Sequence, residues 1–241
     1  MKRIIFVTAL LTLFNSVTFC QSVLNYQTGT SLEVQTGATV CADNVIMNGT
    51  FTGDGTLCGL FSTLYLTAFI EGFYNPSTNS MVSDTVKVYL RNAAFPYTII
   101  DSTKSTLNST GLGTFTFSYP VNGVNYYIVI KHRNSIETWS GTTQQFTVSA
   151  LSYDFTTANT QAYGNNMASV DSSPVRYGIY SGDINQDGFV NLTDVVSAYN
   201  GSSGFVTGYV PADVNGDNIV DLTDVVITYN NSANFVSLVR P

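Results

Sequence analysis

Charged residues and histidine are scarce in this sequence. Asp, Glu, Lys and Arg make up 10% of the 241 residues, and His132 is the one histidine. No histidine pair is therefore present to bind a metal, and a serine or cysteine nucleophile has at most one histidine partner. The chain also lacks a Gly-x-Ser-x-Gly motif and a phosphate-binding glycine loop. We expect a protein that is not an enzyme, in which His132 is a hydrogen-bonded residue at a strand end.

Catalysis by a pair of carboxylates is the one enzymatic class that remains open, because two carboxylates suffice to cleave a glycosidic bond. The acidic residues of the middle of the chain lie mostly in turns or at strand ends: Glu71, Asp84, Asp101, Glu137 and Asp154. This placement favours structural roles, and a glycoside-active β domain is the less favoured alternative.

Basic clusters and long apolar runs are missing as well. Removal of an N-terminal leader that contains Lys2 and Arg3 leaves 9 − 2 = 7 basic against 16 acidic residues, a net charge of −9. Such a surface repels nucleic acid and anionic lipid, and no basic stripe in the sequence offsets this repulsion. No run of about 20 apolar residues is present to cross a membrane. We expect no nucleic-acid partner and no membrane span.

The leader itself is the first positive signal. Lys2 and Arg3 precede a short apolar run that gives way to small and polar residues before Cys20. This pattern predicts a signal peptide at residues 1–20, a mature chain that starts at Gln21, and a protein that is secreted or at the cell surface. A lipoprotein acylated at Cys20 is the alternative, although Phe19 stands where such signals usually have a small residue.

Two cysteines, Cys41 and Cys58, remain in the mature chain. An even pair of cysteines in an exported protein most often forms a disulfide, so we expect a Cys41–Cys58 bridge. The bridge falls in residues 21–61, where short β-forming stretches alternate with Gly-containing turns. These residues predict stacked β-arcs or a small meander.

Residues 62–180 alternate apolar and polar residues in six or seven stretches separated by turn signals. This period of two predicts an antiparallel β-sandwich, and no helical period interrupts it. The aromatic residues of this region, Tyr65, Phe69, Phe73, Tyr74, Tyr89, Tyr127 and Trp139, suit either the core or a platform that stacks on sugars. The core is the favoured reading.

The C-terminal residues carry oxygen-bearing side chains in a fixed register, twice. Places 1, 3, 5, 9 and 12 are Asp183, Asn185, Asp187, Asn191 and Asp194 in one loop, and Asp213, Asn215, Asp217, Asp221 and Asp224 in the other. Place 7 contributes a backbone carbonyl, from Phe189 and Ile219. A Ca²⁺ ion takes 6–8 oxygen ligands, so each loop predicts one calcium site.

The repetition makes a chance match improbable, because 15 of the 30 positions agree between residues 182–211 and 212–241. Place 6 needs a left-handed backbone, which Gly188 and Asn218 tolerate. Val190 and Val220, at place 8, are expected to join the two loops through a short β-bridge. With four carboxylates against three, the second loop is expected to bind calcium more tightly.

After each loop, "LTDVV..YN" predicts a short amphipathic helix, whereas the stretch with Pro174 before the first loop cannot form an entering helix. A pair of loops with exiting helices only resembles the dockerin type I family, over residues 181–241. The stretches "FIEGFYNPSTNSMVSDTVKVYLRN" and "VIKHRNSIETWS" look similar to a β domain of uncharacterised exported bacterial proteins that end in calcium-repeat modules.

The dockerin resemblance implies two Ca²⁺ ions and a protein partner. The partner is a cohesin-like or other β-sandwich protein, or the module packs on the β domain of its own chain. Partner contacts are implied at Leu192, Thr193, Tyr199, Asn200, Leu222, Thr223, Tyr229 and Asn230. The alternative is that Leu192, Leu222, Tyr199 and Tyr229 pack against each other across the two repeats; we favour this packing for the leucines and leave both readings open for the Tyr-Asn pairs. This chain has Leu and Tyr-Asn where cellulosomal dockerins often have hydroxyl and basic residues.

The chain is therefore expected to be mostly β: a small Gly/Thr-rich β segment, an antiparallel sandwich and a small α-helical calcium-binding module. Its expected function is non-catalytic protein–protein docking or surface assembly. The alternative is a secreted carbohydrate-binding or carbohydrate-active protein of polysaccharide catabolism, which rests on the company that dockerins keep.

Overall fold

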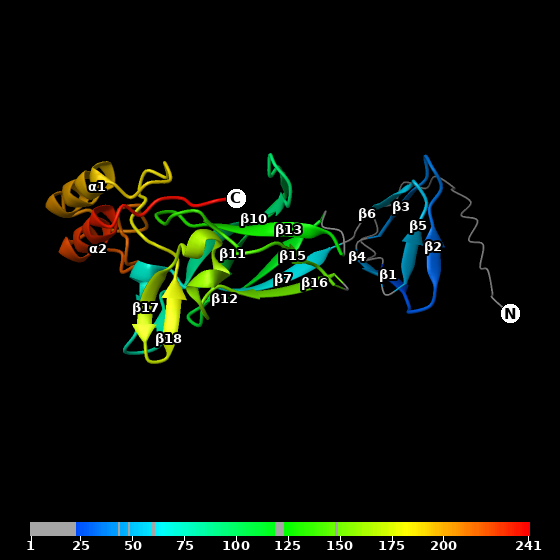
Figure 1. Ribbon diagram of the computed structural model, residues 1–241, viewed down its shortest axis with the longest axis horizontal. Helices are drawn as coiled ribbons and strands as arrows, with labels where there is room; N and C mark the ends of the chain where they lie inside the picture. Colours follow the sequence, from blue (N-terminus) through cyan, green and yellow to red (C-terminus); the bar gives the residue numbers. More distant parts are fainter. Residues whose placement is uncertain (1–22, 43, 48, 59–60, 119–122, 148) are drawn as a thin grey trace, which may run out of the picture.

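The computed structural model describes residues 23–42, 44–47, 49–58, 61–118, 123–147 and 149–241. The expected signal peptide, with Cys20 and Gln21, lies outside these residues. Figure 1 shows an elongated molecule with a small β segment at the N-terminal end, a β-sandwich in the middle and two helices at the opposite end. Most described residues in regular structure are in strands, as the sequence predicts. Neither helix in the described part is long and apolar enough to cross a membrane.

The N-terminal segment consists of three parallel strand pairs. Strand β1 pairs with β4, β2 with β5 and β3 with β6. The bounds are β1 Val23–Tyr26, β2 Ser31–Glu33, β3 Thr39–Cys41, β4 Asn44–Met47, β5 Thr50–Thr52 and β6 Thr56–Cys58. Parallel pairing of each strand with the one three places later is the arrangement of stacked β-arcs and differs from a meander. Cys41 is disulfide-bonded and stands directly opposite Cys58 in the β3–β6 register.

The sandwich has two sheets with the strand orders β11-β10-β13-β14 and β12-β7-β16, and β15 also pairs with β13. The bounds are β7 Ser62–Thr67, β10 Asp84–Asn92, β11 Ile99–Leu107, β12 Leu112–Phe117, β13 Asn125–Lys131, β14 Thr138–Trp139, β15 Gln144–Gln145 and β16 Ala150–Asp154. One pairing differs from the expected antiparallel sandwich, because β16 runs parallel to β7. Strand β16 reaches this sheet by crossing from the other one, so no hairpin forces it to run antiparallel.

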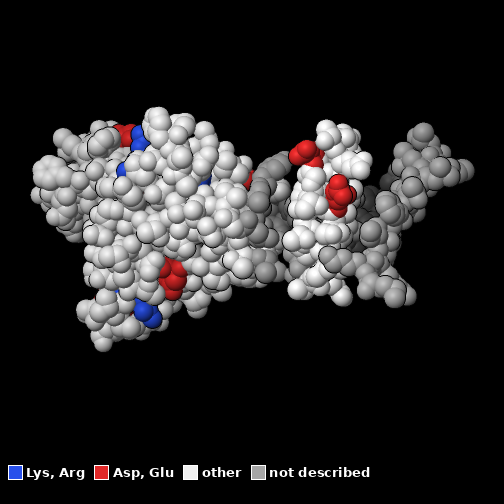
Figure 2. All heavy atoms as spheres, turned by 45° about the vertical axis from the view of Figure 1, so that its right-hand side comes forward, with Lys and Arg blue, Asp and Glu red and all other residues white. Residues whose placement is uncertain are grey.

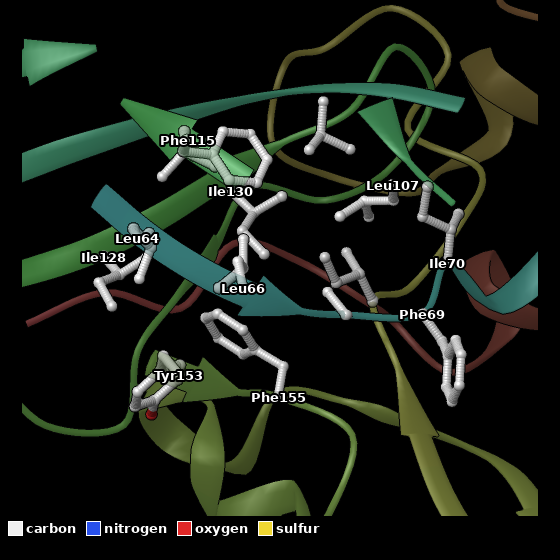
Figure 3. Packing of buried hydrophobic residues seen from close by; sticks show 14 of the residues in the cluster. Leu64, Leu66, Phe69, Ile70, Leu107, Phe115, Ile128, Ile130, Tyr153 and Phe155 are labelled. Carbon is white, nitrogen blue, oxygen red and sulfur yellow. The ribbon is translucent and has the colours of Figure 1, made fainter. Parts of the chain in front are cut away.

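The apolar residues of the alternating stretches fill the space between the sheets. Leu64 and Leu66 of β7, Phe115 of β12 and Ile128 and Ile130 of β13 are fully buried in one cluster, shown in Figure 3. The outward positions of β10, among them Lys87, Tyr89 and Arg91, face away from this core. Because strand side chains alternate between faces, these two sets follow from the sequence pattern.

Short elements lie between strands β7 and β10 of the sandwich and between β16 and the C-terminal repeats. They are η1 Glu71–Phe73, β8 Tyr74–Asn75, β9 Ser80–Met81, η2 Asn159–Gln161, η3 Tyr163–Asn165, β17 Ala168–Ser172 and β18 Val175–Gly178. Strand β18 occupies the stretch after Pro174, so no helix enters the first loop, as expected. Each loop leads into one helix, α1 Leu192–Ser203 or α2 Leu222–Ala233, and the two helices contact each other.

Candidate metal centre

The first and last acidic residues of each loop are buried. Neither helix carries a basic side chain that could pair with them, and Arg133 of the sandwich pairs with Asp213. Asp183 and Asp194 of the first loop are 2% and 0% exposed, and Asp213 and Asp224 of the second are 1% and 0% exposed. A buried carboxylate needs hydrogen bonds or a cation to offset its lost hydration. The loops therefore bring together the two ends of each twelve-residue register.

Backbone N–H groups curl around these carboxylates in both loops. Asp183 accepts from the N–H groups of Asp187 and Gly188, at 3.1 and 3.2 Å, and Asp194 accepts from those of Ile184, Asn185 and Asn191. The second loop repeats the pattern. Asp213 accepts from Gly216 and Asn218, and Asp224 accepts from Val214, Asn215 and Asp221. The same backbone path at both places explains why half of the positions are identical.

The helix starts use the same residues as the loops. Asn191 and Asp221, at place 9, are the N-caps of α1 and α2, and Asp194 and Asp224 complete a capping box in each helix. In a capping box the side chains of the N-cap and N3 residues satisfy each other's backbone N–H groups. Loop closure and helix initiation are therefore one structural event in each repeat.

The chemistry of the donor set fits calcium. Every candidate ligand offers oxygen, which suits a hard cation, and the carboxylates are close enough to disfavour one another. Burial, with the nearby charges of Asp194 and Asp187, raises the pKa of Asp183 to about 6. Burial likewise raises the pKa of Asp224. Within the described residues no three acidic, histidine or cysteine side chains converge on one point, so an ion would also need the Asn and carbonyl oxygens.

Place 6 adopts the left-handed backbone that the register requires, with φ of 88° at Gly188 and 68° at Asn218. The expected bridge between Val190 and Val220 is wrong. Val190 donates its N–H to Val236 and Val220 donates to Val206, so each loop pairs with the segment that follows the other repeat's helix. Each helix reverses the direction of the chain, which brings the segment after it alongside the loop of the other repeat. The side chains of Val190 and Val220 are buried there.

The residues implied for partner binding lie on the outer faces of the helices. Leu192 and Leu222 are 71% and 70% exposed, and Tyr199 and Tyr229 are 61% and 60% exposed. Thr193, Asn200, Thr223 and Asn230 are exposed too. The amphipathic pattern suggested that the Leu residues pack in the module, but the helices bury the opposite side, with Asp194 and Ala198 in α1. The structure therefore presents two matched apolar stripes to solvent.

Contacts that the sequence did not reveal fix the repeats to the sandwich. Arg133, just after β13, donates to Asp213 Oδ2 at 3.2 Å and to the Val210 carbonyl, and Asn134 donates to the Asp213 carbonyl at 2.7 Å. Glu71 accepts from Ser181 N–H at 3.0 Å and from Asn231 of α2 at 2.5 Å. The module thus packs on the β domain of its own chain, one of the two arrangements that the resemblance implied.

Glycines were the available signal for this interface. A side chain at Gly72 would collide with the Val214 carbonyl, and one at Gly216 would collide with the Phe73 ring. Gly72 is small because two backbones approach each other there, whereas Gly216 leaves room for the Phe73 ring and has a positive φ of 77°. The sequence shows the glycines but gives no hint of which distant segment lies against each.

His132 lies between Asp84 and Ser135, with both ring nitrogens 3.0 Å from an oxygen. Burial of Asp84 is outweighed by hydrogen bonds from His132 and Tyr209, which hold the pKa of that carboxyl well below its usual range. Burial lowers the pKa of His132. The ring is then neutral, so its Nε2–H donates to the Asp84 carboxylate and its Nδ1 accepts from the Ser135 hydroxyl.

This order of groups is that of a Ser-His-Asp triad, but Ser135 is fully buried. Arg133 also donates to Asp84, at 3.0 Å, and Tyr209 donates at 2.8 Å. A nucleophile must reach a substrate, whereas this hydroxyl lies beneath the loops of the module. The hydrogen-bonded role expected for His132 is confirmed, in an interface and not at a free strand end.

The aromatic residues do not form one platform. Phe69, Phe73, Tyr74 and Trp139 are buried, while Tyr65 is exposed on the other sheet. Trp139 is covered by the rings of Tyr97 and Tyr127, with centroids 5.9 and 5.7 Å away. The preference for core over platform is confirmed for Phe69, Phe73 and Tyr74, which belong to the core cluster, whereas Trp139 is buried outside that cluster.

No protein-family model matches the chain, and no curated protein matches it. Among solved structures, it is similar to two interface mutants of a type II cohesin–X–dockerin complex from Acetivibrio cellulolyticus. The C-terminal interface mutant has 17% identity and a TM-score of 0.40, over 73% of this chain and 99% of that chain. The N-terminal interface mutant has 17% identity and a TM-score of 0.39, over 73% and 97%. Likenesses of this size carry no inference about function.

Proposed function

We propose that this chain is an exported, non-catalytic docking protein whose C-terminal repeats belong to the dockerin type. Each repeat binds one Ca²⁺ ion through the twelve-place register, and the two helices present the docking surface to a protein partner. The matched exposure of the apolar stripes is the observation that carries the proposal. Packing within the chain does not account for a leucine and a tyrosine that are exposed at the same places in both repeats, whereas a partner that covers them does.

The docking surface consists of Leu192, Val196 and Tyr199 on α1 and Leu222, Val226 and Tyr229 on α2. The exposed fractions agree within one percentage point between each residue and its counterpart. Exposed aromatic residues on a rigid helix are common anchors of protein interfaces. Because both stripes offer the same side chains, a partner can dock in either of two orientations related by the repeat.

Calcium binding is tested first, by titration calorimetry of the full chain. We expect two bound ions per chain in the wild type and one in Asp187→Ala or Asp217→Ala, which remove place 5 from one loop each. Binding of no ion, or persistence of both ions in each variant, contradicts the assignment of the loops.

Docking is tested with Tyr199→Ala, Tyr229→Ala and the double variant, each used to capture partners from the exported proteins of the producing organism with calcium or with chelator. Two-orientation docking predicts that a calcium-dependent partner is retained by both single variants and lost by the double variant. Phe95→Ala is the matched control, since Phe95 is 84% exposed on the sandwich and far from the helices in sequence. Equal loss with Phe95→Ala, or retention by the double variant, excludes the helical surface.

A further inference from the structure

Three lysines form a row across the outer face of the larger sheet. Lys87 of β10 stands directly opposite Lys104 of β11 on one side and Lys131 of β13 on the other. Residues directly opposite in antiparallel strands project from the same face. Val86 and Val88, the neighbours of Lys87, point into the core, so the row faces away from it. The sequence conceals this row because its members come from three strands.

No carboxylate neutralises the row within the described residues. All ion pairs among the described residues involve His132 or Arg133, and none involves Lys87, Lys104 or Lys131. Like charges directly opposite each other destabilise a sheet. Three of the 9 basic residues of an acidic chain therefore stand together at a cost to its stability.

Protection of a sheet edge accounts for only one of them. Strand β11 is outermost in its sheet, so Lys104 is where an edge charge discourages pairing with other chains. Lys87 and Lys131 belong to interior strands, which need no such protection. A ligand with negative charge explains all three.

An aromatic ring lies beside the row on the same face. Tyr89 is half-buried, and Lys87 Nζ is 4.6 Å from the centroid of its ring. Arg91, the next outward residue of β10, is committed elsewhere: its guanidinium lies 5.1 Å from the Trp139 ring and donates to the Tyr97 carbonyl at 3.2 Å. Arg91 also lies over the Tyr89 ring, 5.7 Å from its centroid, so this ring already contacts two cations of its own chain and the available groups are the three ammonium groups.

We propose that this lysine row (Lys87, Lys104 and Lys131) binds an acidic polysaccharide. Adjacent strands place the lysines about 5 Å apart, as a flat line of cations for the acid groups of a polymer. Tyr89 holds the Lys87 ammonium group in the row through the cation–π contact. Binding here uses none of the residues of the docking surface, so it is a second activity of the chain.

A polysaccharide fits this face better than nucleic acid does. Duplex DNA carries one charge per about 1.7 Å, and its affinity depends on many phosphate contacts. Three lysines supply few such contacts, and the formal net charge of −7 repels so dense a polyanion. A polymer of sugar acids spaces its charges more widely, so three lysines can neutralise the acid groups of a short segment.

The test is titration of the full chain, in excess calcium and at low ionic strength, with a galacturonate hexamer and its neutral methyl ester. We expect binding of the acid that weakens with added salt, and binding of the ester at least about tenfold weaker. The double variant Lys104→Gln/Lys131→Gln should lose about tenfold in affinity, as expected for two lost ionic contacts. Tyr89→Ala should weaken binding without changing its salt dependence.

A matched control separates the row from net charge. Arg176→Gln/Arg240→Gln removes the same charge outside the row and should leave the affinity unchanged. Equal losses in the two double variants, no binding by the wild type, or tighter binding of a single-stranded oligonucleotide or of anionic phospholipid vesicles overturns the proposal. Thermal unfolding verifies folding, and Lys104→Gln alone, at the exposed edge, replaces the double variant if that one is destabilised.

Discussion

At the scale of single residues, Arg133 connects the sandwich with the second loop. Its guanidinium lies between two buried carboxylates, 3.0 Å from Asp84 and 3.2 Å from Asp213. It is the one basic side chain within ion-pair distance of Asp213 in the described part of the chain. The second loop has four carboxylates and the first has three, and the positive charge of Arg133 offsets part of this excess. The number of carboxylates alone therefore overstates the expected difference in calcium affinity between the two loops.

Replacement of Arg133 by Met should therefore destabilise the protein more without calcium than with it. In chelator the change leaves Asp213 buried without a cation, which typically costs about 3–5 kcal/mol when a buried pair is broken. On the proposed function, calcium supplies a replacement cation for Asp213, so the loss should be smaller when calcium is present. The measurement is the midpoint of thermal unfolding in both conditions. Equal losses in calcium and in chelator would show that Arg133 acts on Asp84 alone.

The pKa of His132 is lowered by burial, and this predicts a pH dependence of stability. In the unfolded chain the imidazole takes up a proton below its ordinary pKa of 6.5, whereas the folded chain resists it until lower pH. The unfolded state then binds more protons, so stability should fall as the pH drops below 6.5 toward the folded pKa. The measurement is urea unfolding in saturating calcium, which on the proposed function occupies the loop carboxylates and removes their titration from the slope.

His132→Gln is the matching variant, because the amide can still donate to Asp84. We expect the slope below pH 6.5 to be shallower in this variant than in the wild type. An unchanged slope would assign the pH dependence to another group.

At the scale of elements, the two repeats use the same residues for the proposed calcium ligands and for helix initiation. Asp224 is both the twelfth place of its loop and the N3 residue of the α2 capping box. Asp217, at place 5 of the same loop, is exposed and takes no part in the cap. The two residues thus separate the loss of a ligand from the loss of a helix start.

We expect Asp224→Ala to abolish calcium binding in the second loop and to fray α2 even without calcium. The variant leaves three backbone N–H groups without their acceptor, at about 1–3 kcal/mol for each unsatisfied group. Asp217→Ala should remove calcium binding and retain the helix start. Hydrogen exchange of the peptides that cover residues 222–233 distinguishes them, and equal protection in the two variants in chelator would contradict the shared role of Asp224.

The strands of the sandwich were predicted better than the buried side of the helices. Alternation identified the inward residues of the strands, such as Val88 and Ile130, because a strand has two faces and only one is buried. The same reasoning assigned Leu192 to the inside of a helix, and this was wrong. A short helix whose buried side carries Asp194, Ala198 and Gly201 against a loop needs no large apolar residues there. Periodicity marks a stripe but does not say whether this chain or a partner covers it.

At the scale of the whole molecule, the sandwich and the C-terminal repeats form a shared interface. Its members, Glu71, Arg133, Ser181, Asp213 and Asn231, come from distant segments, which is why no local pattern in the sequence predicted it. On the face shown in Figure 2 charged side chains are few. Unfolding of one part should therefore affect the other.

Trp139 makes this coupling measurable. It is the one tryptophan of the chain, it is 1% exposed, and it belongs to β14 of the sandwich, whereas the calcium loops lie in the repeats. On the proposed function, calcium binds the folded loops and should stabilise whatever unfolds together with them, by about 2.7 kcal/mol at a concentration 100 times the dissociation constant. We expect the midpoint of thermal unfolding followed by Trp139 fluorescence to rise with calcium. A midpoint that does not respond to calcium would mean that the sandwich unfolds on its own.

Gly72→Ala provides the control for this coupling, since Gly72 is in η1 of the sandwich side and its new methyl group would meet the Val214 carbonyl of the second loop. The collision should push the loop away and weaken the interface, while the first loop, which Gly72 does not face, keeps its calcium. We therefore expect the calcium-dependent rise in the Trp139 midpoint to shrink, with at least one ion still bound by calorimetry. If the variant keeps the full rise, the coupling passes through Arg133 and Glu71 and not through the close approach of these two backbones.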